Sequence, residues 1–383
     1  MSRLQQLMSD LSAAASSPDE ALLGMPGAFY TDAEFFAHER NTVLWYGWHC
    51  LGRVDEIPSP GDFFTVQLLD EPLLVVRGDD DVVRVLSNIC RHRGMPLAEG
   101  RGSSKRFICS YHAWTYGRDG QLLRAARMNN SRLDVKNCRL PEFNSFIWRG
   151  AIYCSLDDAA VPFIEENQGL DALVENYEPE QFRLVHVAEE DWRCNWKSLV
   201  ENFMEGYHLS VVHPETLHGY TPTGLSKKAT SGPGFTSYLA NYPDSAASRG
   251  EGSERLSADQ RKRSTLYSVF PCQVASQSAT LLVSLTIIPK SADLIGVKWT
   301  MSTYGNQLDE ATVAERVKLW EEVNAEDREK LERMQVALRS AHALAGPLAG
   351  QDFEGTIHDF HVWMDGQLND GLNTFDETGQ QAG

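Results

Sequence analysis

One stretch organises the second half of the chain: Asn195-Trp-Lys-Ser-Leu-Val-Glu-Asn-Phe-Met-Glu-Gly-Tyr-His-Leu-Ser-Val-Val-His213. It combines two histidines and two glutamates with the spacing of a helix. At about 100° per residue, Glu201, Glu205 and His208 fall on one helical face, and the last two are neighbours at i and i+3. We therefore expect the Glu205 carboxylate and the His208 imidazole to meet.

The second histidine, His213, follows His208 by five residues, which on an ideal helix would turn the two imidazoles about 140° apart. Pro214 disfavours helical geometry at His213, so the helix must end or distort if the two rings converge. Two histidines with open positions beside them are typical of a ferrous iron site, provided that a carboxylate comes from elsewhere in the chain. The alternative is that both histidines only cap or pack at a helix end.

The composition predicts a soluble protein of two domains. The chain has 383 residues, of which 42% are apolar, enough for more than one core. A net charge of −18 argues against nucleic acid or an anionic membrane as a partner. The N-terminus has no signal-peptide pattern and no run is long enough to span a membrane, so we expect a cytoplasmic location. Seven scattered cysteines favour metal ligation over a disulfide framework.

Residues 48–156 predict an all-β module, because short β-rich runs alternate there with Gly, Pro and Asp turns. Two of its loops carry Cys90-Arg-His92 and Cys109-Ser-Tyr-His112. Two thiolates and two imidazoles are the ligands of a Rieske [2Fe–2S] cluster. A structural zinc is the competing interpretation, but zinc sites usually pair the cysteines first and the histidines afterwards. Here each loop supplies one of each.

Taken together, these motifs resemble the α subunit of a Rieske non-haem iron oxygenase, over residues 28–365. The runs that carry the resemblance are Asn88–Leu97, Cys109–Tyr116, Gly120–Leu123 and Asn195–His213. The chain departs from the family pattern at Ser110, where Pro is usual, and at Glu205, where most members have Asp.

The resemblance implies two metal centres. The cluster ligands would be Cys90, His92, Cys109 and His112, and the ligands of a mononuclear ferrous iron would be His208, His213 and Asp327. Asp327 lies in a charged helix predicted over residues 308–345, where a lone Asp would ordinarily be solvated, and Glu326 is its nearest rival. Glu205 would bridge the iron of one protomer to the cluster of its neighbour in a homotrimer.

The expected fold class is α+β, with an all-β Rieske domain and, as the resemblance implies, a helix-grip catalytic domain. We expect a helical lead-in at residues 1–44 that packs on the catalytic domain, with one helix over residues 31–45. The Rieske domain would span 45–156 and the catalytic domain 157–383. Strands are predicted at 184–192, 264–270, 281–289 and 294–303, and a helix with surface histidines at 353–370. Residues 221–263 read as a long, lid-like loop.

The function implied is that of a terminal oxygenase, which uses O2 to hydroxylate or N-demethylate a small quaternary ammonium substrate. Members of the carnitine, choline and glycine betaine monooxygenase type often carry Glu at the bridging position, as this chain does. The absence of a dinucleotide fingerprint predicts a separate flavin and iron–sulfur reductase. Aromatic-ring or aromatic-acid hydroxylation is the alternative, and a β subunit remains open. A pure electron carrier would not need Glu205, His208, His213 and Asp327. A helix-grip binding module would not need the cluster ligands.

Candidate residues for holding a cationic head group are aromatic. They are Tyr207, Tyr220, Phe235, Tyr238, Phe270, Trp299, Phe360 and Trp363.

Overall fold

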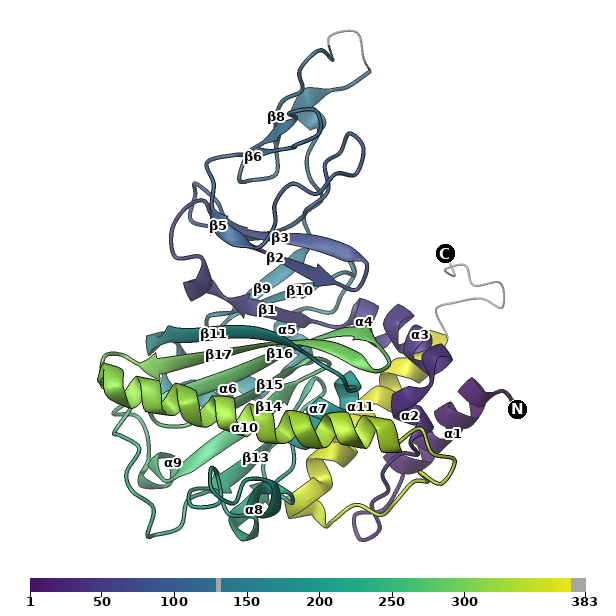
Figure 1. Cartoon of the computed structure of the whole chain (residues 1–383), viewed down its shortest axis with the longest axis vertical. Coiled ribbons are helices and arrows are strands. Elements are labelled where there is room, and N and C mark those ends of the chain that lie inside the picture. The colour runs from purple at the N-terminus through teal and green to yellow at the C-terminus, as the bar shows by residue number, and fades with distance from the viewer. Residues whose placement is uncertain (129–131, 373–383) are drawn as a thin grey trace. The chain divides into compact units, whose positions relative to one another are not determined.

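The computed structural model describes residues 1–128 and 132–372 and forms two compact units (Figure 1). One unit is Trp48–Ala160. The other joins Met1–Gly47 to the chain from Val161 onward. No helix within the described ranges is both long and apolar enough to cross a membrane.

The unit Trp48–Ala160 consists of three small antiparallel sheets, with strand orders β1-β10-β9, β4-β3-β2-β5 and β6-β7-β8. Its strands are β1 (His49–Arg53), β2 (Asp62–Leu68), β3 (Glu71–Arg77), β4 (Val83–Ser87), β5 (Arg101–Ser103), β6 (Phe107–Ile108), β7 (Thr115–Tyr116), β8 (Leu122–Arg124), β9 (Asn144–Trp148) and β10 (Ala151–Ser155). Arg149 and Gly150 both have positive φ, which gives the tight turn that joins β9 to β10.

The core of this unit forms beneath the two loops that carry the Cys/His motifs. Cys90 and Cys109 are each 2% exposed and lie in one apolar cluster with Phe107, Trp114 and Tyr116. The cysteines are therefore anchored by hydrophobic burial, and the loops around them lie at the edge of the core.

The larger unit is built on a seven-stranded antiparallel sheet of order β11-β17-β16-β15-β14-β13-β12. Its strands are β11 (Phe182–Trp192), β12 (Ser226–Lys228), β13 (Phe235–Asn241), β14 (Arg263–Val269), β15 (Gln273–Gln277), β16 (Leu281–Ser291) and β17 (Leu294–Tyr304). The mixture of antiparallel sheet and helices confirms the predicted α+β class.

Eleven α-helices of the described chain belong to this larger unit. They are α1 (Arg3–Ala15), α2 (Ala28–Thr31), α3 (Ala33–Asn41), α4 (Val43–Tyr46), α5 (Phe163–Glu166), α6 (Leu170–Val174), α7 (Trp196–Phe203), α8 (Leu209–Val212), α9 (Ala258–Arg261), α10 (Glu310–Ala337) and α11 (Gln351–Leu372). α7 contacts β15 and β16, while α11 contacts β12 and β13 and also packs against α1. The long α10 crosses the unit beside the sheet (Figure 1).

The lead-in is helical but broken, so the single helix predicted over residues 31–45 is wrong. Asp32 accepts a hydrogen bond from the Phe35 N–H and thereby caps α3. The chain leaves helical geometry at Thr42, whose hydroxyl donates to the His38 carbonyl at 2.7 Å. A Thr side chain bonded back to the preceding turn competes with the continuing helix.

The predicted lid-like loop at 221–263 is also wrong, because it contains β12 and β13 and ends in α9. The Ser and Thr residues of β13 are buried, and distant groups satisfy them. Thr236 donates to Asp359 at 2.7 Å, and Ser237 donates to the Thr230 carbonyl at 2.5 Å. Because these buried residues are polar, the sequence of β13 lacks the apolar alternation from which a strand is predicted.

Candidate functional site

The helix α7 positions the site, and it ends earlier than its periodicity predicts. The Asn195 side chain caps its start by accepting from the Lys197 N–H at 3.0 Å. Its last residue is Phe203, so the helix does not run through Glu205 to His208. The Met204 carbonyl accepts from the Thr356 hydroxyl, and the Gly206 N–H donates to the Phe353 carbonyl at 3.2 Å. Both partners come from α11, which terminates α7 by tertiary contact.

Beyond this break, Glu205 organises the turn that carries His208. One carboxylate oxygen accepts from the backbone N–H groups of Tyr207 and His208, and the other contacts His208 Nδ1. The two groups therefore meet as expected, although through a turn and not on a helical face. With Nδ1 engaged, the imidazole presents its Nε2.

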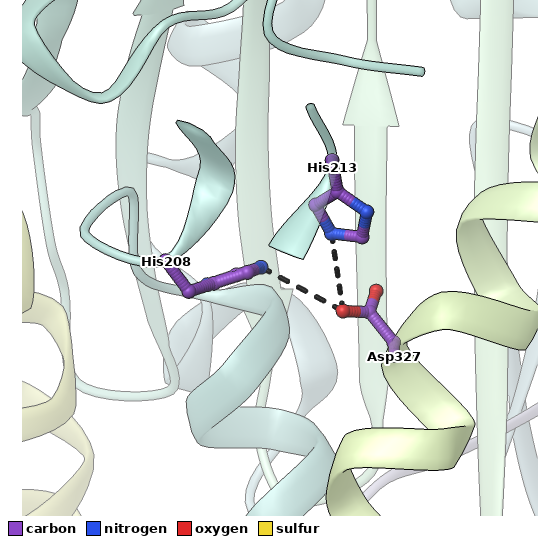
Figure 2. A group of neighbouring side chains, drawn as sticks. All are labelled: His208, His213 and Asp327. Carbon is purple, nitrogen blue, oxygen red and sulfur yellow. Dashed lines mark ion pairs between the residues drawn. The ribbon is translucent and has the colours of Figure 1, made fainter. Parts of the chain in front are cut away.

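His208, His213 and Asp327 converge on one point (Figure 2). The Asp327 Oδ1 lies 3.1 Å from His213 Nε2 and 3.7 Å from His208 Nε2. One ligand atom from each residue lies within 4.8 Å of the other two. His213 Nε2 and Asp327 Oδ1 are buried and have no hydrogen-bond partner. Two imidazoles and one carboxylate are the ligand set of non-haem ferrous iron, and an ion there would satisfy these atoms.

Glu326 lies on the opposite side of the same imidazole. Its Oε2 is 2.7 Å from His213 Nδ1 and 2.7 Å from the Thr216 hydroxyl. Burial opposes protonation of His213, but the Asp327 and Glu326 carboxylates together raise its pKa above the ordinary value. Of the two acids weighed from the sequence, Asp327 thus lies on the Nε2 side and Glu326 on the Nδ1 side.

Asp327 faces inward because of its place on α10. The buried residues of this helix follow one helical stripe: Trp320, Val323, Asn324, Asp327, Leu331 and Gln335. Asp327 is therefore buried, with 7% of its surface exposed, like the apolar residues of the same stripe.

The Cys/His loops form a second convergence within the β unit. The Nδ1 atoms of His92 and His112 are 3.1 Å apart, and His112 is exposed while both cysteines are buried. Buried thiolates with imidazoles toward the edge would suit a two-iron cluster, which cysteines hold at one iron and histidines at the other.

Two residues near these ligands were missed as functional candidates. The Tyr116 hydroxyl lies 3.4 Å from Cys90 Sγ and accepts the Arg91 N–H at 3.0 Å. The Trp114 ring stacks on His92 at 4.9 Å between centroids. Both belong to the run Cys109–Tyr116, so their proximity to the second Cys/His motif was the available signal.

Other candidates lie elsewhere. His361 was expected at the surface but is fully buried, with Nε2 3.2 Å from Glu201 Oε1. A further histidine beyond α8, His218, is exposed and contacts the Ser210 hydroxyl. Among the aromatic candidates, Phe270, Phe360 and Trp363 pack against one another in the core.

Comparisons with known proteins match both units. The model of the ring-hydroxylating α subunit, catalytic domain, matches residues 178–370, and that of the Rieske [2Fe–2S] domain matches residues 47–144. Together these domains imply a Rieske [2Fe–2S] cluster and a mononuclear iron.

Two relatives and one solved structure illustrate the likeness. The chain is 34% identical to the carnitine monooxygenase oxygenase subunit of Escherichia coli K12, over 52% of this chain and 54% of that protein. It is 33% identical to the glycine betaine monooxygenase oxygenase subunit of Chromohalobacter salexigens, over 51% and 44%. These matches span about half of each relative. The quaternary ammonium Rieske monooxygenase CntA shares the fold, with a TM-score of 0.80, 21% identity and coverage of 93% and 97%. CntA has been solved with γ-butyrobetaine and with L-carnitine as substrates.

Proposed function

Because the chain belongs to the family of ring-hydroxylating α subunits, we propose that it is the terminal oxygenase of a multicomponent Rieske monooxygenase that acts on a small quaternary ammonium compound. The observation that carries the proposal is the convergence of His208, His213 and Asp327, with two ligand atoms buried and unpartnered. An electron carrier would have no use for this arrangement.

The proposed iron ligands are held by a second layer of carboxylates. When bound, the cluster passes single electrons and the ferrous iron, which keeps open ligand positions, supports dioxygen chemistry. Glu205 holds His208 through Nδ1, and Glu326 holds His213 in the same way. Each carboxylate would favour the tautomer in which Nε2 is free to bind the iron, and would increase the basicity of the ring. In the β unit, Cys90, His92, Cys109 and His112 are the proposed cluster ligands, and the Tyr116 hydroxyl, 3.4 Å from the Cys90 sulfur, would donate to the thiolate of a bound cluster.

The substrate class rests on the relatives. Two of these relatives are named for carnitine and glycine betaine, which are compounds that carry an N-methylated ammonium group. Hydroxylation of an N-methyl carbon gives a carbinolamine that releases formaldehyde. Aromatic-ring or aromatic-acid hydroxylation is the second candidate, which the description of the catalytic-domain family favours.

The assembly proposed is a cytoplasmic homotrimer served by a separate flavin and iron–sulfur reductase, with neither nucleic acid nor membrane as a partner. Exposed apolar groups support contacts between copies. Ile108 and Tyr111 are 58% and 54% exposed beside the proposed cluster ligands, and Tyr207 and Val211 are 58% and 81% exposed beside the proposed iron ligands. In such a trimer Glu205 would bridge the iron of one protomer to the cluster of the next.

The test is oxygen uptake by the iron-loaded protein with a surrogate reductase and NADH, across N-methyl quaternary amines and aromatic acids. We expect uptake coupled to formaldehyde release with an amine. Coupled uptake only with aromatic acids would establish the second candidate. The Glu205→Gln variant should keep both metal centres and lose turnover, whereas retained turnover would contradict the bridging role.

A further inference from the structure

Two arginines, Arg249 and Arg316, lie outside the metal site. The guanidinium carbon of Arg249 lies 4.1 Å from the centroid of the Tyr220 ring and 5.7 Å from that of Tyr242. Its Nε and Nη2 atoms are buried and make no hydrogen bond. A guanidinium has five donors and no way to lose its charge in a protein, so buried unpaired donors are costly. These two donors therefore lack the hydrogen-bond partners that a buried guanidinium needs.

The second arginine, Arg316, comes from α10 and interacts electrostatically with Arg249 and with the same two tyrosines. It is half-buried, and burial, followed by repulsion from Arg249, lowers its pKa, while Tyr220, Tyr242 and Glu315 oppose that shift. Neither guanidinium forms an ion pair with a carboxylate anywhere in residues 1–128 or 132–372. The chain has 53 acidic residues and only 35 basic ones, so carboxylates to neutralise this pair are abundant. Two like charges held together without one indicate a site for an external anion.

The position of the pair relates it to the proposed iron ligands. Arg316 precedes Asp327 by eleven residues of α10, which places the two about 20° apart around the helix and roughly 16 Å apart along it. Both therefore lie on the same face of α10. Tyr220 follows His213 by seven residues in the chain segment beyond α8.

We propose that Arg249 and Arg316 form a binding site for a small carboxylate, which the two guanidinium groups hold between them beside the rings of Tyr220 and Tyr242. Planar guanidinium groups bind carboxylates in a bidentate manner, and the charge strengthens each hydrogen bond. The Tyr220 face, expected from the sequence to hold a substrate cation, is occupied by Arg249 and is therefore part of an anion site.

The carboxylate has two possible sources, which share this chemistry. It is the acid group of a betaine substrate, an assignment that rests on the proposed function, or it is a separate organic acid. Butyrate, γ-butyrobetaine and butyltrimethylammonium distinguish these sources, because they carry respectively the carboxylate alone, both groups, and the ammonium group alone on chains of four carbons.

The experiment is calorimetric titration of each compound into the metal-loaded protein and into the variants Arg249→Gln and Arg316→Gln. The matched control is Lys318→Gln, which removes one positive charge from an exposed position of α10 two residues from Arg316. We expect each arginine variant to weaken butyrate binding by about tenfold or more. The control should change it by less than about twofold, and butyltrimethylammonium should bind all variants alike. Unfolding curves show whether each variant is folded, and Arg316→Lys should restore part of the affinity.

Competition between butyrate and γ-butyrobetaine, lost in the arginine variants, would identify the substrate carboxylate. Arginine-dependent butyrate binding without competition would identify a separate acid. Absent butyrate binding, an equal loss in Lys318→Gln, or tighter binding of inorganic phosphate than of any carboxylate would overturn the proposal. Failure of every amine in the oxygen-uptake assay would instead overturn the proposed reaction and leave butyrate binding unchanged.

Discussion

The two ends of α7 show two kinds of buried charge. Near its start, Lys197 Nζ lies 2.5 Å from Glu39 Oε1, and both side chains are fully buried. The indole N–H of Trp196 donates to the other Glu39 oxygen at 3.2 Å, and the centroid of the Phe29 ring lies 4.6 Å from Lys197 Nζ. Beyond its end, Asp327 Oδ1 and His213 Nε2 form an ion pair at 3.1 Å, but neither atom has a hydrogen-bond partner.

The two sites differ in whether their buried charged groups have hydrogen-bond partners. Burial raises the pKa of Glu39 and lowers that of Lys197, and each partner opposes the shift of the other, so the pair is closed on itself. The His213 Nδ1 contacts Glu326, whereas His213 Nε2 and Asp327 Oδ1 are buried without a hydrogen bond where they converge. A buried ion pair with complete hydrogen bonds orders the fold, whereas buried polar atoms that lack hydrogen bonds and face a common point indicate a ligand.

The largest effect on stability should come from breaking the buried ion pair between Lys197 and Glu39. Replacing Lys197 with Met leaves the Glu39 carboxylate buried without a cation, which should lower the free energy of unfolding by about 3–5 kcal/mol in urea titrations. The iron content of the folded protein should not change. The double variant Lys197→Met, Glu39→Gln should recover part of the loss. Lost iron with unchanged stability would mean that this pair belongs to the metal site.

The opposite response is expected at the other end. Asp327→Ala removes a buried acceptor that makes no hydrogen bond, so the metal-free variant should be as stable as the metal-free parent or more stable, by up to about 1–3 kcal/mol. It should also lose the mononuclear iron and keep the two cluster irons, which metal analysis and the visible spectrum measure. Ferrous iron should raise the melting temperature of the parent and not that of the variant. Destabilisation of the metal-free variant would contradict the distinction.

A smaller effect should follow from loosening one imidazole. Glu326→Gln keeps the shape of the side chain but removes the charge that holds His213 Nδ1, and ferrous iron should bind about 10- to 100-fold more weakly. Competition with a chelator measures this affinity without turnover. Glu322→Gln, on the exposed side of α10, is the control and should bind iron normally. Equal iron affinity in both variants would show that Glu326 does not position the ligand.

The smallest effect should come from removing the hydroxyl that contacts Glu326. Thr216→Val removes a single hydrogen bond to Glu326, which should cost about 0.5–1.5 kcal/mol of unfolding free energy. Iron affinity should fall by less than in Glu326→Gln, because the carboxylate still contacts His213. A larger loss of iron than in Glu326→Gln would place Thr216 closer to the metal than the structure does.

Local chemistry made part of this arrangement predictable. His213 is the residue just outside α8, as Pro214 required. The end of α7 could not be predicted, because the groups that terminate it, Thr356 and Phe353, are about 150 residues away. The helical spacing of glutamates and apolar residues continues past Met204 in the sequence, and it carries no information about the Met204 carbonyl or its partner.

The two acids of α10 show the same limit. Adjacent carboxylates in a charged helix have equal claims when only the sequence is known, and the resemblance favoured Asp327. Their different positions depend on which side of the His213 ring each reaches and on the Thr216 hydroxyl that holds Glu326. Both facts arise from packing between segments more than 100 residues apart. The strand β13 was missed for a related reason, since Asp359 satisfies its buried Thr236 from α11.

Because Glu326 and Asp327 are consecutive, α10 contacts both nitrogens of one imidazole. An ion bound to His213 and Asp327 would therefore fasten the middle of this 28-residue helix to the segment beyond α8. Local opening of α10 would then require the ion to be released, which links metal occupancy to the opening equilibrium of the helix. Amide hydrogens around Asp327 should exchange more slowly as iron is added, while those near the ends of α10 should keep their rates.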